Sequence, residues 1–214
     1  MAAREFRKAS VAAAATAVAA GVQAAEPASV DALLAAIKGA DEKARGAAWQ
    51  GAGPCGAPAI QPLAAVMVDA DFEIARSAMR AVWKIVRHAG RPGAQEERIA
   101  VIRALSPLLD DEQPVVVRRE VLWMLSEIAG ERAVPRVAAL LAHAELREDA
   151  RTVLVRLPGQ EAVQALQAAL ASAPAEFKPA LADALRARGV DTPGVPSLRL
   201  KPVKQTNVKP IGPA

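Results

Sequence analysis

The stretch DEQPVVVRREVLWMLSEIAG, residues 111–130, contains in one place the pattern that decides the fold of this 214-residue chain. A turn with Asp111 comes first, and Pro114 suits the first position of a helix, where no backbone donor is needed. The pair Val117-Arg118 follows, then apolar residues at helical spacing, and Gly130 closes the segment. The spacing predicts an amphipathic helix between the turn and the glycine.

An apolar residue directly before a cation, early in a predicted helix, recurs along the chain. It occurs at Ala44-Arg45, Ala75-Arg76, Val117-Arg118 and Ala150-Arg151, and in a degenerate form at Phe177-Lys178. The cations are 31, 42, 33 and 27 residues apart. Recurrence every 20–50 residues or so is typical of solenoids, in which each unit packs against its neighbours. We therefore expect about five antiparallel helix pairs over residues 29–189.

Composition indicates an all-α protein. Hydrophobic residues make up 52% of the chain and aromatic residues only 3%, so the apolar volume lies mainly in Ala, Leu and Val. Alanine is the strongest helix former, and no segment alternates β-branched residues as a strand would. Ser29, Asp41 and Asp71 stand where helix N-caps are expected. The first helix of the third pair should extend to Leu108 or Leu109.

The net charge of +4 and the pI near 9.6 arise at the ends of the chain. The first 24 residues contain three cations and one acid, and the last 16 contain four cations and no acid. Residues 25–198 contain 20 cations and 22 anions, so the expected folded part is close to neutral. Because nucleic-acid-binding domains concentrate cations on their folded surface, the pI does not by itself predict one.

The N-terminus has the order of a secretory signal peptide. Arg4, Arg7 and Lys8 precede a small, mostly apolar stretch, and Val22-Gln23-Ala24 suits a cleavage site. We expect residues 1–24 to be removed after Ala24, leaving a soluble periplasmic or secreted protein. An ordinary Ala-rich N-terminal helix is the alternative. The apolar stretch is shorter than the roughly 20 residues of a membrane span.

Two segments outside the repeats have no helical pattern. Residues 25–28 are expected to form a short linker. Residues 190–214 contain four cations and several prolines and cannot bury an apolar face, so we expect a disordered basic tail. Such a tail could make weak, salt-sensitive contact with an anionic membrane.

The repeated unit resembles the HEAT-repeat family, and more narrowly its short bacterial forms. The resemblance covers about residues 29–189 and rests on the turn Asp, the Ala-Arg or Val-Arg pair, the later apolar residues and the closing Gly. It implies a right-handed superhelix whose second helices line the concave side. It also implies a polar ladder between turn aspartates and arginines. On this sequence the ladder falls on Asp41/Arg45, Asp71/Arg76, Asp111/Arg118 and Asp149/Arg151. The fifth unit departs from the pattern, with Lys178-Pro179 and no turn Asp.

The sequence offers little chemistry. It has two histidines, His88 and His143, one cysteine, Cys55, and no tyrosine. It lacks His-Glu pairs, CxxC, HExxH, a phosphate-binding loop and a GxSxG elbow. We therefore expect no catalytic residues, no metal site and no cofactor. Cys55 is expected to be a small buried residue, with a reactive thiol or an interchain disulfide as the alternative.

A row of cations on one predicted helix suggests a binding surface. The row and its neighbours on the next second helix are Arg76, Arg80, Lys84, Arg87 and His88, with Arg119 and Trp123. Helical spacing places the row on one stripe, which could bind an acidic segment of a partner. The alternative is a solvated polar face, with Trp49, Trp83 and Trp123 packing between helices.

The function expected from these features is a non-enzymatic scaffold. It would bind a protein or peptide partner, of acidic character if the cation row is used, on the face formed by the second helices. One alternative is nucleic-acid binding through a concave basic surface, which the near-neutral body and the predicted export disfavour. Another is a lyase-type enzyme or an enzyme-associated subunit, because bilin lyases contain similar repeats.

Overall fold

The computed structural model describes residues 29–197, which contain ten α-helices, five short 3₁₀-helices and no strands. The α-helices are α2 (Val30–Lys38), α3 (Glu42–Gly51), α4 (Ile60–Val66), α5 (Phe72–Ala89), α6 (Gln95–Leu105), α7 (Val115–Ile128), α8 (Val134–Ala139), α9 (Arg147–Arg156), α10 (Gln160–Ser172) and α11 (Lys178–Ala187). The 3₁₀-helices are η1 (Gly53–Cys55), η2 (Ala57–Ala59), η3 (Ser106–Leu109), η4 (Gly130–Ala133) and η5 (Leu140–Ala142). The all-α prediction is confirmed for this part of the chain.

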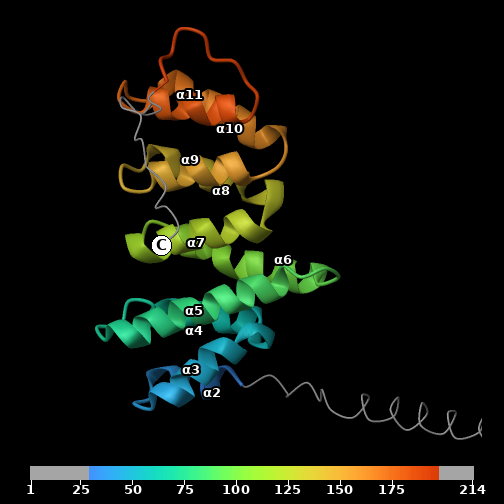
Figure 1. Cartoon of the computed structure of the whole chain (residues 1–214), viewed down its shortest axis with the longest axis vertical. Coiled ribbons are helices and arrows are strands. Elements are labelled where there is room, and N and C mark those ends of the chain that lie inside the picture. The colour runs from blue at the N-terminus through green and yellow to red at the C-terminus, as the bar shows by residue number, and fades with distance from the viewer. Residues whose placement is uncertain (1–28, 198–214) are drawn as a thin grey trace, which may run out of the picture.

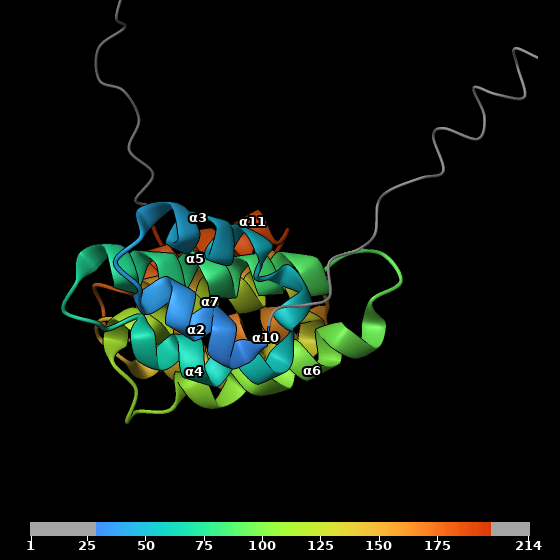
Figure 2. The same ribbon diagram turned by 90° about the horizontal axis from the view of Figure 1, so that it is seen from below.

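The helices are arranged in layers that follow one another in chain order. Each odd-numbered helix packs against the even-numbered helix before it, from α2 with α3 to α10 with α11. The odd-numbered helices also pack on one another in the order α3, α5, α7, α9 and α11, up the long axis of the molecule (Figure 1). Seen along that axis, α3, α5 and α11 gather on one side, and α4 and α6 on the other (Figure 2).

Three predicted N-caps fix the starts of the early helices. Ser29 accepts a hydrogen bond from the backbone N–H of Ala32 at 3.1 Å. Asp41 accepts from two N–H groups at the start of α3, and Asp71 from two at the start of α5. Side-chain caps satisfy donors that have no partner inside the helix, each contributing about 1 kcal/mol.

The core is one apolar cluster that runs through all the layers, from Leu33 to Leu185. The helical spacing of residues 117–128 predicts the buried face of α7, where Val121, Leu122 and Leu125 are at most 1% exposed. Each such side chain contributes about 1.5–3 kcal/mol when fully buried. Substantial helix contacts join only neighbouring layers, so this burial is shared between adjacent pairs.

Arginine side chains add polar links between layers. Arg188, which follows α11, donates to the carbonyl oxygens of Leu154 and Val155 in the last turn of α9 and of Leu157 and Gly159 just beyond it. The final carbonyls of a helix have no partner inside it and form the negative end of its dipole, which a cation stabilises.

Helix α6 ends earlier than the sequence predicts. Its α-helical part stops at Leu105, and Leu108 and Leu109 lie in η3. Pro107 has no N–H to donate to the carbonyl one turn earlier, so the α-helical ladder cannot continue regularly. Both leucines are nevertheless buried, as their spacing predicts.

The sequence pattern predicts a disordered tail that starts at residue 190, which is earlier than the structure supports. Val190 donates its N–H to the carbonyl of Leu185 at 3.0 Å, and Arg186 donates to the carbonyls of Thr192 and Val195. These bonds hold residues 190–195 against the end of α11, and the Arg186 side chain supplies two of the three donors. The expected leader, the linker and residues 198–214 of the expected tail lie outside the described residues.

Within residues 29–197, no helix combines the length and the apolar character that crossing a bilayer requires.

Candidate functional site

One of the four predicted ladder pairs is formed. Arg118 Nη2 lies 2.6 Å from Asp111 Oδ1, and the arginine is only 2% exposed whereas the aspartate side chain is 87% exposed. Arg118 also retains a buried Nε that has no hydrogen-bond partner in the structure. The pair therefore compensates a charge that helix packing places in the interior.

The other three predicted pairs are wrong, because each arginine has a different partner. Arg45 donates to the carbonyl of Gly39, Arg76 pairs with Glu73 at 2.5 Å, and Arg151 pairs with Glu148 at 2.8 Å. Glu73 and Glu148 lie one helical turn before their arginines, which is the spacing that brings helix side chains together. The carboxylates of Asp41 and Asp71 are instead used as N-caps.

The remaining ladder residue, Asp149, connects α9 with α7. Its carboxylate accepts a hydrogen bond from Trp123 Nε1 at 3.1 Å and lies 3.0 Å from Arg119 Nε. One layer earlier, Trp83 Nε1 of α5 donates to Glu120 of α7 at 3.0 Å. Two consecutive layers are thus joined by an indole that donates to a carboxylate of the next odd-numbered helix.

Sequence reasoning missed these indole–carboxylate contacts. The two pairs are separated by 37 and 26 residues, so no fixed interval marks them. The available signal is that Trp83 and Trp123 are both followed, in the next second helix, by an acidic residue within the first two turns. All three tryptophans are half-buried, so neither full core packing nor full exposure describes them.

Cations of the predicted row lie over tryptophan rings. Arg80 and Lys84 of α5 lie 5.2 and 5.8 Å from the ring centroid of Trp49 on α3. Arg87 lies 5.0 Å from the ring of Trp83 in its own helix. Each such contact contributes about 0.5–1 kcal/mol at an exposed site. The cations of this row therefore contact aromatic rings and are not simply solvated.

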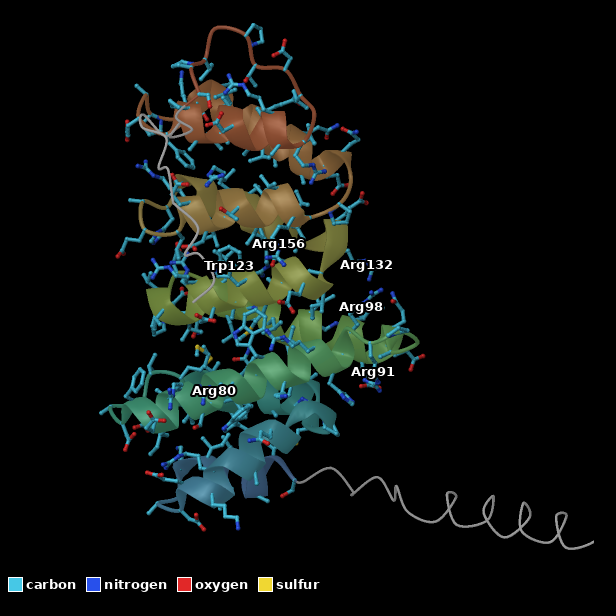
Figure 3. The ribbon with its side chains drawn as sticks, viewed as in Figure 1. Arg80, Arg91, Arg98, Trp123, Arg132 and Arg156 are labelled. Carbon is cyan, nitrogen blue, oxygen red and sulfur yellow. The ribbon has the colours of Figure 1, made fainter. Side chains whose placement is uncertain are left out.

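The same arrangement occurs higher in the stack. Arg156 of α9 lies 5.8 Å from the ring of Trp123 on α7. Figure 3 shows Arg80, Trp123 and Arg156 following one another up the layers. The structure thus places Arg80 and Lys84 together at Trp49, and Arg119 together with Trp123 at Asp149.

The predicted binding residues differ in how far their charge is neutralised. Arg76, Arg87 and Arg119 have carboxylates within 2.5, 3.7 and 3.0 Å. Among residues 29–197, no carboxylate pairs with Arg80 or Lys84. A hollow of about 400 Å³ between α3 and α5 is lined by Trp49 and Arg80, and also by the carboxylates of Glu42 and Glu73. A carboxylate of another molecule could be held there.

Residues 29–197 contain no group of three or more His, Cys, Asp or Glu side chains placed to bind a metal ion. Burial raises the pKa of the Cys55 thiol, which keeps it in the less reactive protonated form. A hydrogen bond from Arg91 lowers the pKa of Glu97, and the same bond raises the pKa of Arg91. A surface ion pair thus explains the lowered pKa of Glu97.

Comparison with known proteins does not assign the chain to a family. No family model matches the sequence, and no curated protein matches it. Among solved structures, a crystal structure described only as that of an engineered protein matches with 20% sequence identity, over 74% of this chain and 78% of the other. Its TM-score of 0.38 is too low to support an argument about fold or function.

Proposed function

We propose that residues 29–189 form a right-handed α-solenoid of HEAT-like helix pairs, and that the protein is a non-enzymatic scaffold for protein–protein interaction. The partner would bind the face formed by α3, α5, α7, α9 and α11. The observation that carries this proposal is that these five helices pack side by side in chain order. Proteins built of stacked helix pairs bind through such extended surfaces.

The α3–α5 part of this face supports a protein partner with an acidic segment. Trp49 and Arg80 line the hollow of about 400 Å³, and Lys84 lies over the ring of Trp49. Tryptophan and arginine are enriched among the residues that dominate binding energies in protein interfaces. The two cations are free to form ion pairs across an interface, because their charges are not compensated within residues 29–197.

The distribution of charge favours a protein over a nucleic acid. On the rest of this face, carboxylates contact the other tryptophans and an arginine: Glu120 contacts Trp83, Glu127 contacts Arg87 and Asp149 contacts Trp123. A nucleic-acid backbone carries closely spaced phosphates, which interspersed carboxylates would repel. A partner with a few well-separated acids is a better match.

We also propose that the protein acts in the periplasm or outside the cell, on the basis of its N-terminal sequence. N-terminal sequencing of native protein should give a chain that begins at Ala25. Retention of residues 1–10 would contradict export by a cleaved leader.

Site-specific photo-crosslinking in the native host tests the scaffold proposal. A photoreactive amino acid replaces Lys84 on α5 in one full-length variant and Arg103, an exposed residue of α6, in the control. We expect a discrete protein adduct from position 84, identified by mass spectrometry, and none from position 103. Identical adducts from both positions, or no protein adduct from any exposed position of α3, α5, α7, α9 and α11, would overturn the proposal.

A further inference from the structure

A second cleft, distinct from the α3–α5 hollow, lies where the α6–α7 layer meets the α8–α9 layer. It has a volume of about 590 Å³ and is lined by α6, the end of α7, the α7–α8 turn and the end of α9. Its apolar lining includes Ile99, Ile102 and Pro158. Small-molecule and peptide pockets are commonly of this size, with an apolar lining and a few polar groups that orient the ligand.

Three arginines from three different elements line this cleft: Arg98 of α6, Arg132 of η4 and Arg156 of α9. Within residues 29–197, none of the three forms an ion pair. Arg98 donates to the amide oxygen of Gln95, and Arg156 lies over Trp123. In the view of Figure 3, Arg98 and Arg132 lie on the side of the stack towards which α6 projects. Arg156 lies between them and Trp123.

The two carboxylates of the cleft do not neutralise these arginines. Glu127 has Arg87 as its ion-pair partner at 3.7 Å. Glu131 lies directly against Gly159, at the place that a Cβ would occupy. Gly159 precedes α10, and a carboxylate is favoured at that positive helix end. The cleft therefore keeps an excess of positive charge.

Helix electrostatics do not explain why all three arginines are there. Arg156 stands in the last turn of α9, where a cation suits the dipole. Arg98, however, lies in the first turn of α6, and Arg132, although in the last turn of the short η4, lies two residues before the start of α8. Cations at the N-terminal ends of helices are disfavoured. Like charges at one place also repel one another unless an anion lies between them.

We propose that this cleft is a docking site for an acidic peptide segment of a protein partner, in which an apolar side chain is flanked by carboxylates. The apolar side chain would pack on Ile99, Ile102 and Pro158, and the carboxylates would be bound by Arg98, Arg132 and Arg156. Guanidinium groups bind carboxylates with two parallel hydrogen bonds, so the arrangement selects both charge and geometry. The inference rests on the proposed function, that the chain binds a protein, and it names the chemistry of the bound segment.

The charge of the folded part argues for a peptide over a nucleic acid here too. Residues 29–197 contain 20 cations and 21 anions, and Glu127 and Glu131 border the cleft itself. A short segment with two to four carboxylates can avoid these glutamates, whereas a continuous row of phosphates cannot.

Isothermal titration calorimetry of the full-length protein tests the proposal with defined probes. The probe is the blocked peptide Glu-Glu-Leu-Glu-Glu, and its uncharged counterpart is Gln-Gln-Leu-Gln-Gln. We expect saturable one-to-one binding of the acidic peptide only. Binding should weaken at least about tenfold in the double variant Arg132→Gln/Arg156→Gln, because charge-assisted hydrogen bonds are lost.

A matched control removes the same total charge elsewhere. Lys43→Gln/Arg103→Gln changes two exposed cations that do not line the cleft, and its affinity should stay within about twofold of the unchanged protein. Equal weakening in both double variants would show general charge attraction and overturn the cleft. Absence of acidic-peptide binding by the unchanged protein, or binding of a single-stranded oligonucleotide that is lost in Arg132→Gln/Arg156→Gln, would also overturn it.

A further variant separates failure of the cleft from failure of the proposed function. If Arg80→Glu/Lys84→Glu abolishes peptide binding and Arg132→Gln/Arg156→Gln does not, the peptide binds the α3–α5 hollow. The cleft inference then fails, and the scaffold proposal stands. The crosslinks at position 84 test the scaffold whatever the cleft binds.

Tryptophan fluorescence gives a readout local to the cleft. Replacement of Trp49 and Trp83 by Phe leaves Trp123, which Arg156 covers, as the only fluorophore. Movement of Arg156 towards a bound carboxylate should shift the emission of Trp123 with the same concentration dependence as the calorimetric signal. Emission that stays constant through saturation would contradict binding by Arg156.

Discussion

The turns that precede α5 and α7 have similar sequences and different electrostatics. In the first, Asp71 is the N-cap of α5, and Arg76 pairs with Glu73 near the surface. In the second, Pro114 occupies the N-cap position, so Asp111 lies outside the helix and reaches Arg118. Arg118 is almost completely buried, whereas the Arg76 side chain is 36% exposed.

The difference shows that the position of the aspartate relative to the cap decides its role. A carboxylate at the N-cap accepts backbone hydrogen bonds and is poorly placed to reach an arginine one turn later. When a proline starts the helix, the aspartate before it is released to pair with a side chain. The same apolar–cation pair therefore gives a surface ion pair in α5 and a buried charge in α7.

The largest effect is expected from Asp111→Ala. This change leaves Arg118 in the interior with no anionic partner, and we expect a loss of about 2 kcal/mol in the free energy of unfolding. Urea unfolding followed by circular dichroism measures it. Glu112→Ala, an exposed neighbour, should change stability by less than about 0.5 kcal/mol.

A double variant checks the physical cause of that loss. Arg118→Met combined with Asp111→Ala removes the buried charge as well as its partner, so most of the lost stability should return. If the double variant is no more stable than Asp111→Ala alone, the interior charge is not the reason for the loss.

A smaller effect is expected at the corresponding turn of α5. Asp71→Ala removes the cap that accepts from Glu73 and Ile74, and should cost about 1 kcal/mol. Asp71→Ser keeps a capping oxygen and should recover most of it in the same urea titration. A loss from Asp71→Ala as large as that from Asp111→Ala would remove the distinction between the two turns.

Arg76→Ala should have a smaller effect again. Arg76 and Glu73 are an exposed pair one turn apart, and such pairs contribute at most about 0.5 kcal/mol. Its unfolding midpoint should thus stay close to that of the unchanged protein, in contrast to Asp111→Ala. A loss above about 1.5 kcal/mol would mean that Arg76 is as important structurally as Arg118.

The smallest effect concerns pH and a third, exposed pair. Because Arg91 lowers the pKa of Glu97 in the folded protein, the pair stabilises the fold above the unfolded-state pKa of glutamate. That contribution disappears as the pH falls through the lowered folded-state pKa. Stability profiles of the unchanged protein and Arg91→Gln should therefore converge at low pH and separate slightly near neutrality. Profiles that separate only in acid would contradict this sign.

Local features of the fold could be predicted from the sequence, because they depend on residues within one turn of each other. Ser29, Asp41 and Asp71 cap the helices that they precede, and the apolar spacing of residues 117–128 identifies the buried face of α7. The end of α6 could not be placed as well, because the prediction followed the apolar spacing of Leu108 and Leu109 and gave too little weight to Pro107.

Contacts between layers could not be predicted in the same way. Whether Trp83 meets Glu120, or Trp123 meets Asp149, depends on how far one helix is displaced along the next. The loops between helices differ in length, so the separation in sequence varies from layer to layer. The cleft arginines come from α6, η4 and α9 for the same reason, and no single helical stripe contains them. Arg98, Arg132 and Arg156 were accordingly absent from the predicted binding residues.

Substantial contacts join only adjacent layers, and this has a consequence for how such a protein evolves. A duplicated or deleted helix pair disturbs two junctions and leaves the others as they were. Length is thus a property that gene duplication can adjust in steps, whereas the residues at each junction diverge separately. Closely related chains of different length could then share the α6–α9 segment while differing in the number of pairs that surround it.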